Sequence, residues 1–177
     1  MIYASCVVLN ADDYEIIETT TWTEKQNFPY ISGLLGFREA PACIRTFELL
    51  SIKPDLIMVD GQGIAHPRGL GIASHIGVLL DIPTIGVAKS ILTGKPEGEL
   101  GEEIGSTVPL IKNGKEIGRM LRTKKNCLPL IVSPGHRISM DTAIALVLNG
   151  LKGYKLPEPT RRAHLAANFC RVSGKSA

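Results

Sequence analysis

The sequence lacks the features of a membrane protein, a secreted disulfide scaffold and a zinc protein. None of its apolar stretches approaches the roughly 18 residues of a transmembrane helix, and its N-terminus has no basic region of the signal-peptide kind. Its four cysteines are scattered and form no Cys-x-x-Cys pair, so neither a disulfide framework nor a zinc site is indicated. We therefore expect a soluble, cytoplasmic protein with reduced thiols and no membrane partner.

A strong charge imbalance and internal repeats are also absent. The 177 residues are 44% hydrophobic and 21% charged, and their formal net charge is +3. This balance permits a polyanionic partner without requiring one. Because no low-complexity segment or linker interrupts the chain, residues 1–177 are expected to form a single domain with a substantial core.

Segments typical of strands and helices alternate along the chain, which indicates an α/β fold. The expected strands are 2–9 and 15–21, which form a hairpin, then 56–59, 84–87, a hairpin around Asn113-Gly114, and 130–132. The expected helices are 39–50, 67–80, one that is capped by Ser139 and ends near Gly150, and one that is capped by Thr160.

Asp60 occupies the most informative position in the sequence. It follows the apolar run Leu56–Val59, which is typical of a strand buried on both faces, and it precedes Gly61 and Gly63. In an open α/β sheet, ligands bind in the crevice beyond the carboxyl end of such a strand. Glycines there would let a large ligand approach the backbone closely. The pattern predicts a ligand site at Asp60.

Glu39 is a second candidate ligand, because it is expected at the head of the helix that precedes the Asp60 strand. Two carboxylates at one crevice would suit magnesium, which takes oxygen ligands together with waters and substrate phosphate. A structural explanation stays open: Glu39 would complement the helix dipole and Asp60 would cap a turn. Lys89, expected just past the next strand, could neutralise a phosphate, and His164 could act as a metal ligand or proton carrier. Taken alone, each of the two is more typical of a solvent-exposed residue.

Two further segments are compatible with nucleic-acid binding. The loop Phe28-Pro29-Tyr30-Ile31 could act as a wedge that parts stacked bases, or it could fold onto the core. A basic run could follow phosphates or form the solvated face of a hairpin. It comprises Lys112, Lys115, Arg119, Arg122, Lys124 and Lys125.

Taken together, six segments resemble the endonuclease V family, and they occur in the family's order. They run from Phe28 to Gly33, Phe37 to Pro41, Val59 to Arg68, Gly86 to Ser90, Val132 to Arg137 and Leu156 to Arg161. The resemblance implies a ribonuclease H-like fold, that is, a mixed sheet flanked by helices. It also implies a metal-dependent endonuclease of DNA repair, which cleaves the phosphodiester bond 3′ to a deaminated base, chiefly inosine.

The resemblance also assigns roles to individual residues. The catalytic residues would be Glu39, Asp60, Lys89 and His164, with Glu39 and Asp60 holding Mg²⁺ or, as a substitute, Mn²⁺. The substrate-binding residues would be Pro29, Tyr30 and Ile31 in the wedge loop, and Arg38, Gly61, His66, Gly71 and His136 elsewhere. The expected partner is DNA containing deaminated bases, with RNA as an alternative, and the expected oligomeric state is a monomer.

One departure from the family favours an alternative function. The family carries a central strand with a further metal-binding aspartate ahead of the strand that starts here at Ile2. If the chain is complete as given, we expect weak or absent cleavage, and the protein would bind altered nucleic acid without cutting it. The pairing edges left beside the gap would also favour dimerisation.

A third hypothesis from another class, a dinucleotide-binding domain, is poorly supported. The third glycine of a Gly-x-Gly-x-x-Gly motif that starts at Gly61 would fall on His66.

Overall fold

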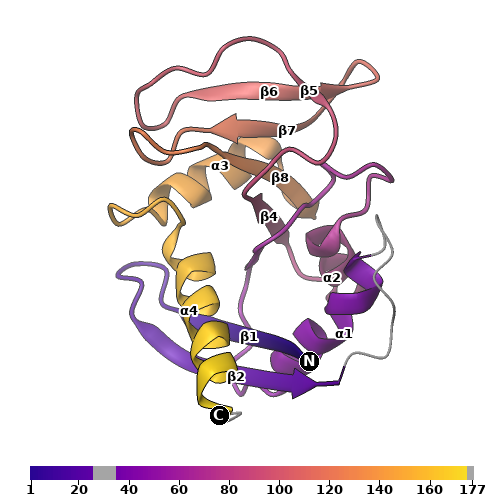
Figure 1. The fold of residues 1–177 in the computed structure, drawn as a ribbon, viewed down its shortest axis with the longest axis vertical. Helices are drawn as coiled ribbons and strands as arrows, with labels where there is room; N and C mark the ends of the chain where they lie inside the picture. Colours follow the sequence, from indigo (N-terminus) through magenta and orange to yellow (C-terminus); the bar gives the residue numbers. More distant parts are fainter. Residues whose placement is uncertain (26–34, 175–177) are drawn as a thin grey trace.

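Two β-sheets and four helices make up the part of the chain that the computed structural model describes, residues 1–25 and 35–174 (Figure 1). Strand β1 (Ile2–Leu9) pairs with β2 (Ile16–Glu24) in a two-stranded antiparallel sheet. The second sheet has six strands in the order β3-β4-β8-β7-β6-β5. Its strands are β3 (Ile57–Val59), β4 (Thr84–Ala88), β5 (Lys95–Pro96), β6 (Thr107–Lys112), β7 (Lys115–Leu121) and β8 (Leu130–His136). The helices are α1 (Leu35–Glu48), α2 (Ile72–Leu80), α3 (Met140–Asn149) and α4 (Glu158–Ser173).

The six-stranded sheet is mixed, because β3 and β4 are parallel and the remaining pairs are antiparallel. Every residue of β4 is buried. Ile85 and Val87 on β4 pack with Val132 on β8 and with Ala143 and Val147 on α3 in the largest hydrophobic cluster. The prediction of a mixed sheet flanked by helices is therefore confirmed.

The two-stranded sheet is attached to the rest of the molecule through helices. The Ser5 hydroxyl donates a 2.6 Å hydrogen bond to the carbonyl of Ala163 on α4, and the Thr20 hydroxyl donates a 2.7 Å bond to the carbonyl of Thr46 on α1. Among the described residues no strand lies between β1 and the six-stranded sheet. This separation agrees with the resemblance, which places a strand of the family's sheet next to β1.

Local turn chemistry agrees with two of the predictions. Asn113 and Gly114, with φ of 50° and 73°, join β6 to β7 in the conformation that Asn-Gly favours in two-residue hairpin loops. The Ser139 hydroxyl accepts a hydrogen bond from the Thr142 N–H at the start of α3, and Gly150 ends that helix.

Three predicted helix starts are wrong. Helix α1 begins at Leu35, so Glu39 lies in its second turn and Pro41 lies in its interior. Helix α2 begins at Ile72 because Gly69 has a φ of 68°, which a right-handed helix cannot contain. Helix α4 begins at Glu158, since the buried Thr160 hydroxyl donates its hydrogen bond back to the carbonyl of Pro157.

Strand β3 is less buried than its apolar sequence predicts. Its three residues are half-buried, in contrast to the fully buried β4 beside it. The reason is its position: β3 is the last strand of the six-stranded sheet and lines a cavity toward β1.

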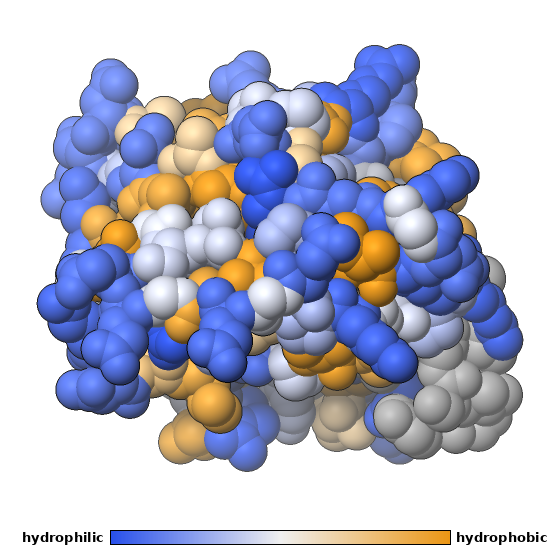
Figure 2. Space-filling model, turned by 90° about the horizontal axis from the view of Figure 1, so that it is seen from above, coloured by the Kyte–Doolittle hydropathy of each residue, from blue (hydrophilic) through white to orange (hydrophobic). Residues whose placement is uncertain are grey.

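The opposite end of the molecule carries strands β5 and β6. Seen from above, this end has hydrophilic side chains around its rim and hydrophobic ones between them (Figure 2). None of the described helices is both long and apolar enough to cross a membrane.

Candidate active site at the end of β3

Asp60 directly follows β3 and is the point where three predicted site residues meet. Lys89, which follows the neighbouring strand β4, donates a 2.6 Å hydrogen bond to Oδ2 of Asp60. Nδ1 of His164 on α4 lies 3.7 Å from the same oxygen. The parallel strands β3 and β4 therefore deliver Asp60 and Lys89 to one edge, as the sequence predicts for neighbouring strand ends.

Glu39 belongs to the same electrostatic environment. Burial raises the pKa of its carboxyl above the ordinary value, and the negative charge of Asp60 raises it further, while Arg38 opposes both effects. Two like charges that influence each other in this way are natural ligands of a divalent cation. Glu39, Asp60, His164 and Arg38 all line the cavity that lies between β1 and β3.

The loop after Asp60 is folded tightly against the start of α2. The N–H of Gly71 donates a 2.9 Å bond to the carbonyl of Gly63, and the N–H of Ala73 donates a 3.0 Å bond to the carbonyl of Gln62. A Cβ on Gly71 would overlap both carbonyl oxygens, and one on Gly63 would overlap the backbone of Pro134. Packing of the protein against itself therefore explains these two glycines, and a role of Gly71 beside a base stays a prediction.

Two residues that the sequence did not single out fix this loop in place. The side-chain amide of Gln62, which is 9% exposed, donates a 2.9 Å bond to the carbonyl of Ser90, just past Lys89. The buried hydroxyl of Ser133 on β8 accepts a 2.9 Å bond from the N–H of Gly63. Their pattern in the sequence is that of ordinary polar residues, so only the three-dimensional contacts identify them.

His66 lies in the same loop and is 8% exposed. Burial lowers its pKa, and the positive charges of Arg68 and Lys112 lower it further. Nδ1 of the ring accepts a 3.2 Å bond from the N–H of Arg68. A neutral ring with this acceptor carries its hydrogen on Nε2, so His66 can offer one N–H donor.

His136 is the predicted site residue that the structure keeps away from Asp60. It is the last residue of β8 and pairs with Thr84, the first residue of β4, whereas Lys89 follows the last residue of that strand. Lys89 lies five positions beyond Thr84 along the strand direction, which corresponds to about 17 Å. Nε2 of His136 lies within hydrogen-bonding distance of Oδ1 of Asp81 instead, at 3.0 Å.

The basic run on the β6–β7 hairpin is largely engaged with the protein itself. Arg119 forms ion pairs with Glu116 and Asp141 at 2.6 and 2.7 Å, and Lys125 forms one with Glu103 at 3.1 Å. Arg122 donates to two backbone carbonyls. These contacts support the explanation that the run is a solvated face of the hairpin. The predicted wedge Pro29-Tyr30-Ile31 lies outside the described residues.

Comparison with known proteins places this site in a family. The family model for Endonuclease V matches residues 1–165. The Endonuclease V of Protochlamydia amoebophila is 58% identical over 176 residues, which is 99% of this chain and 75% of that protein. This chain belongs to the Endonuclease V family. The family membership makes it an endonuclease and confirms the resemblance drawn from the six segments.

Solved structures of this family share the fold. The crystal structure of the Endonuclease V of Streptomyces avermitilis has a TM-score of 0.91 and 41% identity, and the match covers 97% of this chain and 75% of that one. The Ciona intestinalis Endonuclease V, crystallised with a 24mer DNA containing an inosine followed by a ribo-adenosine, has a TM-score of 0.83 and 25% identity. That match covers 98% of this chain and 85% of the Ciona chain. The ribonuclease H-like fold is therefore shared with known Endonuclease V structures.

Proposed function

We propose that this chain is a metal-dependent endonuclease that cleaves the phosphodiester bond 3′ to inosine in DNA. The observation that carries the proposal is the convergence of Lys89 and His164 on one oxygen of Asp60, with the Glu39 carboxyl coupled to it. The inosine-containing DNA bound by the Ciona relative supports the choice of substrate.

Glu39 and Asp60 would hold Mg²⁺, with Mn²⁺ as a substitute. Their chemistry fits, because magnesium is commonly bound by one or two carboxylates plus waters and a substrate phosphate. When bound, the ion supplies Lewis-acid activation of water and stabilises charge on the leaving 3′ oxygen. Lys89 would neutralise the phosphate, and His164 would carry a proton.

His66 would contribute to recognition of the deaminated base. Deamination of adenine replaces an amino donor with a carbonyl acceptor. The single N–H donor of a neutral His66 suits the carbonyl and not the amino group. Gly61, Gly71, Arg38 and the wedge Pro29-Tyr30-Ile31 would complete the substrate contacts that the family resemblance assigns.

A second candidate function is selective binding without cleavage. One observation favours it: the described residues contain no group of three or more His, Cys, Asp or Glu side chains that could hold a metal ion. Such a protein would still recognise inosine through the loop after Asp60, because that recognition does not require the metal.

A nicking assay separates the two functions. We expect Mg²⁺-dependent nicking of a duplex oligonucleotide that contains one inosine. The matched duplex with adenosine should not be nicked, and the D60N variant should not nick either duplex. Retained inosine-selective binding without any nicking would establish the second function. Equal binding of both duplexes without nicking would contradict both.

A further inference from the structure

Three cationic residues lie together where the loop after Asp60 meets the β6–β7 hairpin. Nζ of Lys112, the last residue of β6, donates a 2.5 Å hydrogen bond to the carbonyl of Pro67, so the adjacent Arg68 lies beside the hairpin. Lys115 is the first residue of β7 and pairs directly with Lys112 across the Asn-Gly turn. Arg68, Lys112 and Lys115 are termed the cation cluster below.

The protein supplies no acidic partner to the cation cluster. Within residues 1–25 and 35–174, no carboxylate forms an ion pair with any of its three members. Arg119 and Lys125, farther along the same basic run, both form such pairs. The run therefore has two parts, and the charges at the hairpin turn are the ones that stay uncompensated.

The charges of the cluster are concentrated at one point of the surface. Lys112 and Lys115 occupy directly opposed positions of an antiparallel pair, where like charges destabilise a hairpin. Burial lowers the pKa of the nearby His66, and the positive charges of Arg68 and Lys112 lower it further. A bound anion would relieve this repulsion.

The cluster is open to a large ligand. Pro67, Arg68 and Lys115 are exposed, so an anion would approach the cluster from the outside and not enter an enclosed pocket. Exposed arginine and lysine side chains commonly bind the phosphates of nucleic acid, which carries one charge per nucleotide along its whole length. A polyanion therefore fits this surface better than a single small anion.

The distance from Asp60 indicates which phosphates would reach the cluster. In the order of the sheet, β7 and β6 lie three and four strands beyond β3, at whose end Asp60 stands. At about 4.8 Å between strands, this separation is about 14–19 Å. A duplex rises about 3.4 Å per base pair, so the separation corresponds to about four to six base pairs. A duplex cleaved at Asp60 would meet the cluster with its flank.

We propose that the cation cluster is a second contact to nucleic acid, a site for backbone phosphates about four to six base pairs from the bond cleaved at Asp60. Such a contact adds affinity and fixes the direction of the duplex, and it does not read bases. The inference rests on the proposed function for the identity of the ligand. It goes beyond that function because binding at the cluster requires neither metal nor cleavage.

The test measures the salt dependence of binding without divalent metal, by the fluorescence anisotropy of a labelled inosine duplex. The double variant R68A/K115A spares Lys112, whose bond to Pro67 supports the loop. Loss of two phosphate contacts should reduce the slope of log affinity against log salt concentration by about 1.8, at about 0.9 per contact. Between about 50 and 200 mM salt, the difference in affinity from wild type should shrink about twelvefold.

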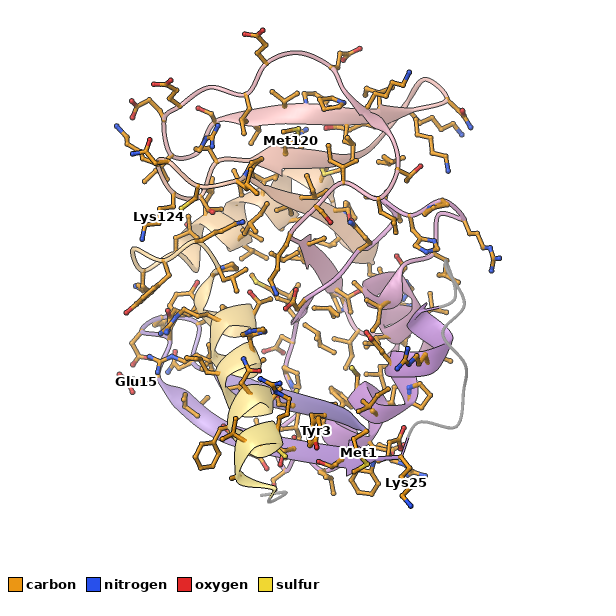
Figure 3. The ribbon with its side chains drawn as sticks, in the orientation of Figure 1. Met1, Tyr3, Glu15, Lys25, Met120 and Lys124 are labelled. Atoms are coloured by element: carbon orange, nitrogen blue, oxygen red, sulfur yellow. The ribbon has the colours of Figure 1, made fainter. Side chains whose placement is uncertain are left out.

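Two controls separate the cluster from positive charge in general. K124A removes an exposed lysine beyond the other end of β7, and it should leave the slope unchanged. Figure 3 shows Lys124 at the left of the view, whereas the turn that joins β6 to β7 lies at the right in Figure 1. R68K/K115R keeps both charges and should retain the wild-type slope. Thermal unfolding checks that all variants fold, and the single variants R68A and K115A decide if the double variant does not.

The length of the duplex locates the contact. Shortening one flank of the inosine site from about ten to about three base pairs should abolish the difference between wild type and R68A/K115A, and shortening the other flank should preserve it. An unchanged slope in R68A/K115A, an equal loss in K124A, or a difference that survives the shortening of either flank would overturn the proposal. A wild type that binds but never nicks would overturn the proposed cleavage alone, because the salt series contains no metal.

Discussion

At the scale of single residues, the nitrogen atoms of Lys89 and His164 near Asp60 approach the same oxygen. Lys89 Nζ and His164 Nδ1 lie 2.6 and 3.7 Å from Oδ2. The ion pairs and hydrogen bonds that the described residues form with the Asp60 carboxylate all use this oxygen. Oδ1 is therefore the oxygen on which we expect a metal ion or a water to bind.

The raised pKa of Glu39 predicts the acid limit of metal binding. A carboxyl whose pKa lies above 4.5 stays protonated to a higher pH, and a protonated carboxyl does not bind Mg²⁺. As the solution is made more acidic, we expect Mg²⁺ affinity and nicking activity to begin to fall at a pH that is still above 4.5. Calorimetric Mn²⁺ titrations across pH measure this limit, and E39Q should remove the pH dependence together with most of the affinity. A wild-type affinity that is constant down to pH 4.5 would contradict the prediction.

The contacts of Gly61 and Gly71, in the loop after Asp60, lead to a second prediction at this scale. G71A would drive a Cβ into the carbonyl oxygens of Gln62 and Gly63, so we expect a loss of about 2–3 kcal/mol in the free energy of unfolding. G61A meets only the side chain of Ile72, at 2.5 Å, and should cost about 1 kcal/mol. Urea unfolding compares the two variants. If the G61A variant were less stable than the G71A variant, the prediction would be wrong, because the loop would then accommodate the Cβ at position 71 more easily than the one at position 61.

At the scale of elements, α4 is held by an ion-paired cluster at its first turn. The Glu158 carboxylate, on a residue that is 2% exposed, accepts bonds from Arg161 at 2.6 and 2.9 Å and from Arg162 at 2.7 Å. Arg161 also stacks on the ring of Tyr154, 4.1 Å from its centroid. The cluster fixes the end of the helix that carries His164 toward Asp60.

Removing the Glu158 carboxylate should destabilise the protein. E158A leaves Arg161, which is mostly buried, without its partner, and we expect a loss of about 3 kcal/mol at neutral pH. Hydrogen bonds from Arg161 and Arg162 lower the pKa of Glu158, so this stabilisation is present above pH 4.5 and is lost as the pH falls through the lowered pKa. Denaturant unfolding at several pH values tests this, and wild type and variant should converge in acid.

The control for this prediction is an exposed ion pair. Glu48 and Arg45 on α1 are 2.8 Å apart, with side chains 52% and 62% exposed. E48A should change stability by less than about 1 kcal/mol. Equal effects of E48A and E158A would argue against a special role of the buried cluster.

The sequence predicted strands and turns better than helix starts. Strand-type segments and Asn-Gly chemistry located the hairpins, because these signals act within a few residues. The start of α4 was misplaced, since Thr160 is held by burial and a bond to Pro157, which a capping pattern does not reveal. Asp60, Lys89 and His164 were brought together as expected, yet the supports Gln62 and Ser133 became visible only through contacts distant in sequence.

At the scale of the whole molecule, the two sheets are joined by helices and loops and not by a continuous ladder. The six-stranded sheet contains the largest hydrophobic cluster, on β4, β7, β8 and α3. The β1–β2 sheet relies on a smaller cluster, of Val8, Phe47 and Leu50. Stability is therefore distributed unevenly between the two parts.

This division should produce two cooperative units in unfolding. A region with a small apolar cluster opens at lower free energy than one with a large cluster, so the β1–β2 hairpin should open first. Native-state hydrogen exchange in low denaturant should show its amides exchanging by sub-global opening. The amides of β4 and β8 should exchange only by global unfolding. Because α1 and α4, which carry Glu39 and His164, both contact β1, the assembled site would then exist only while the weaker unit is closed.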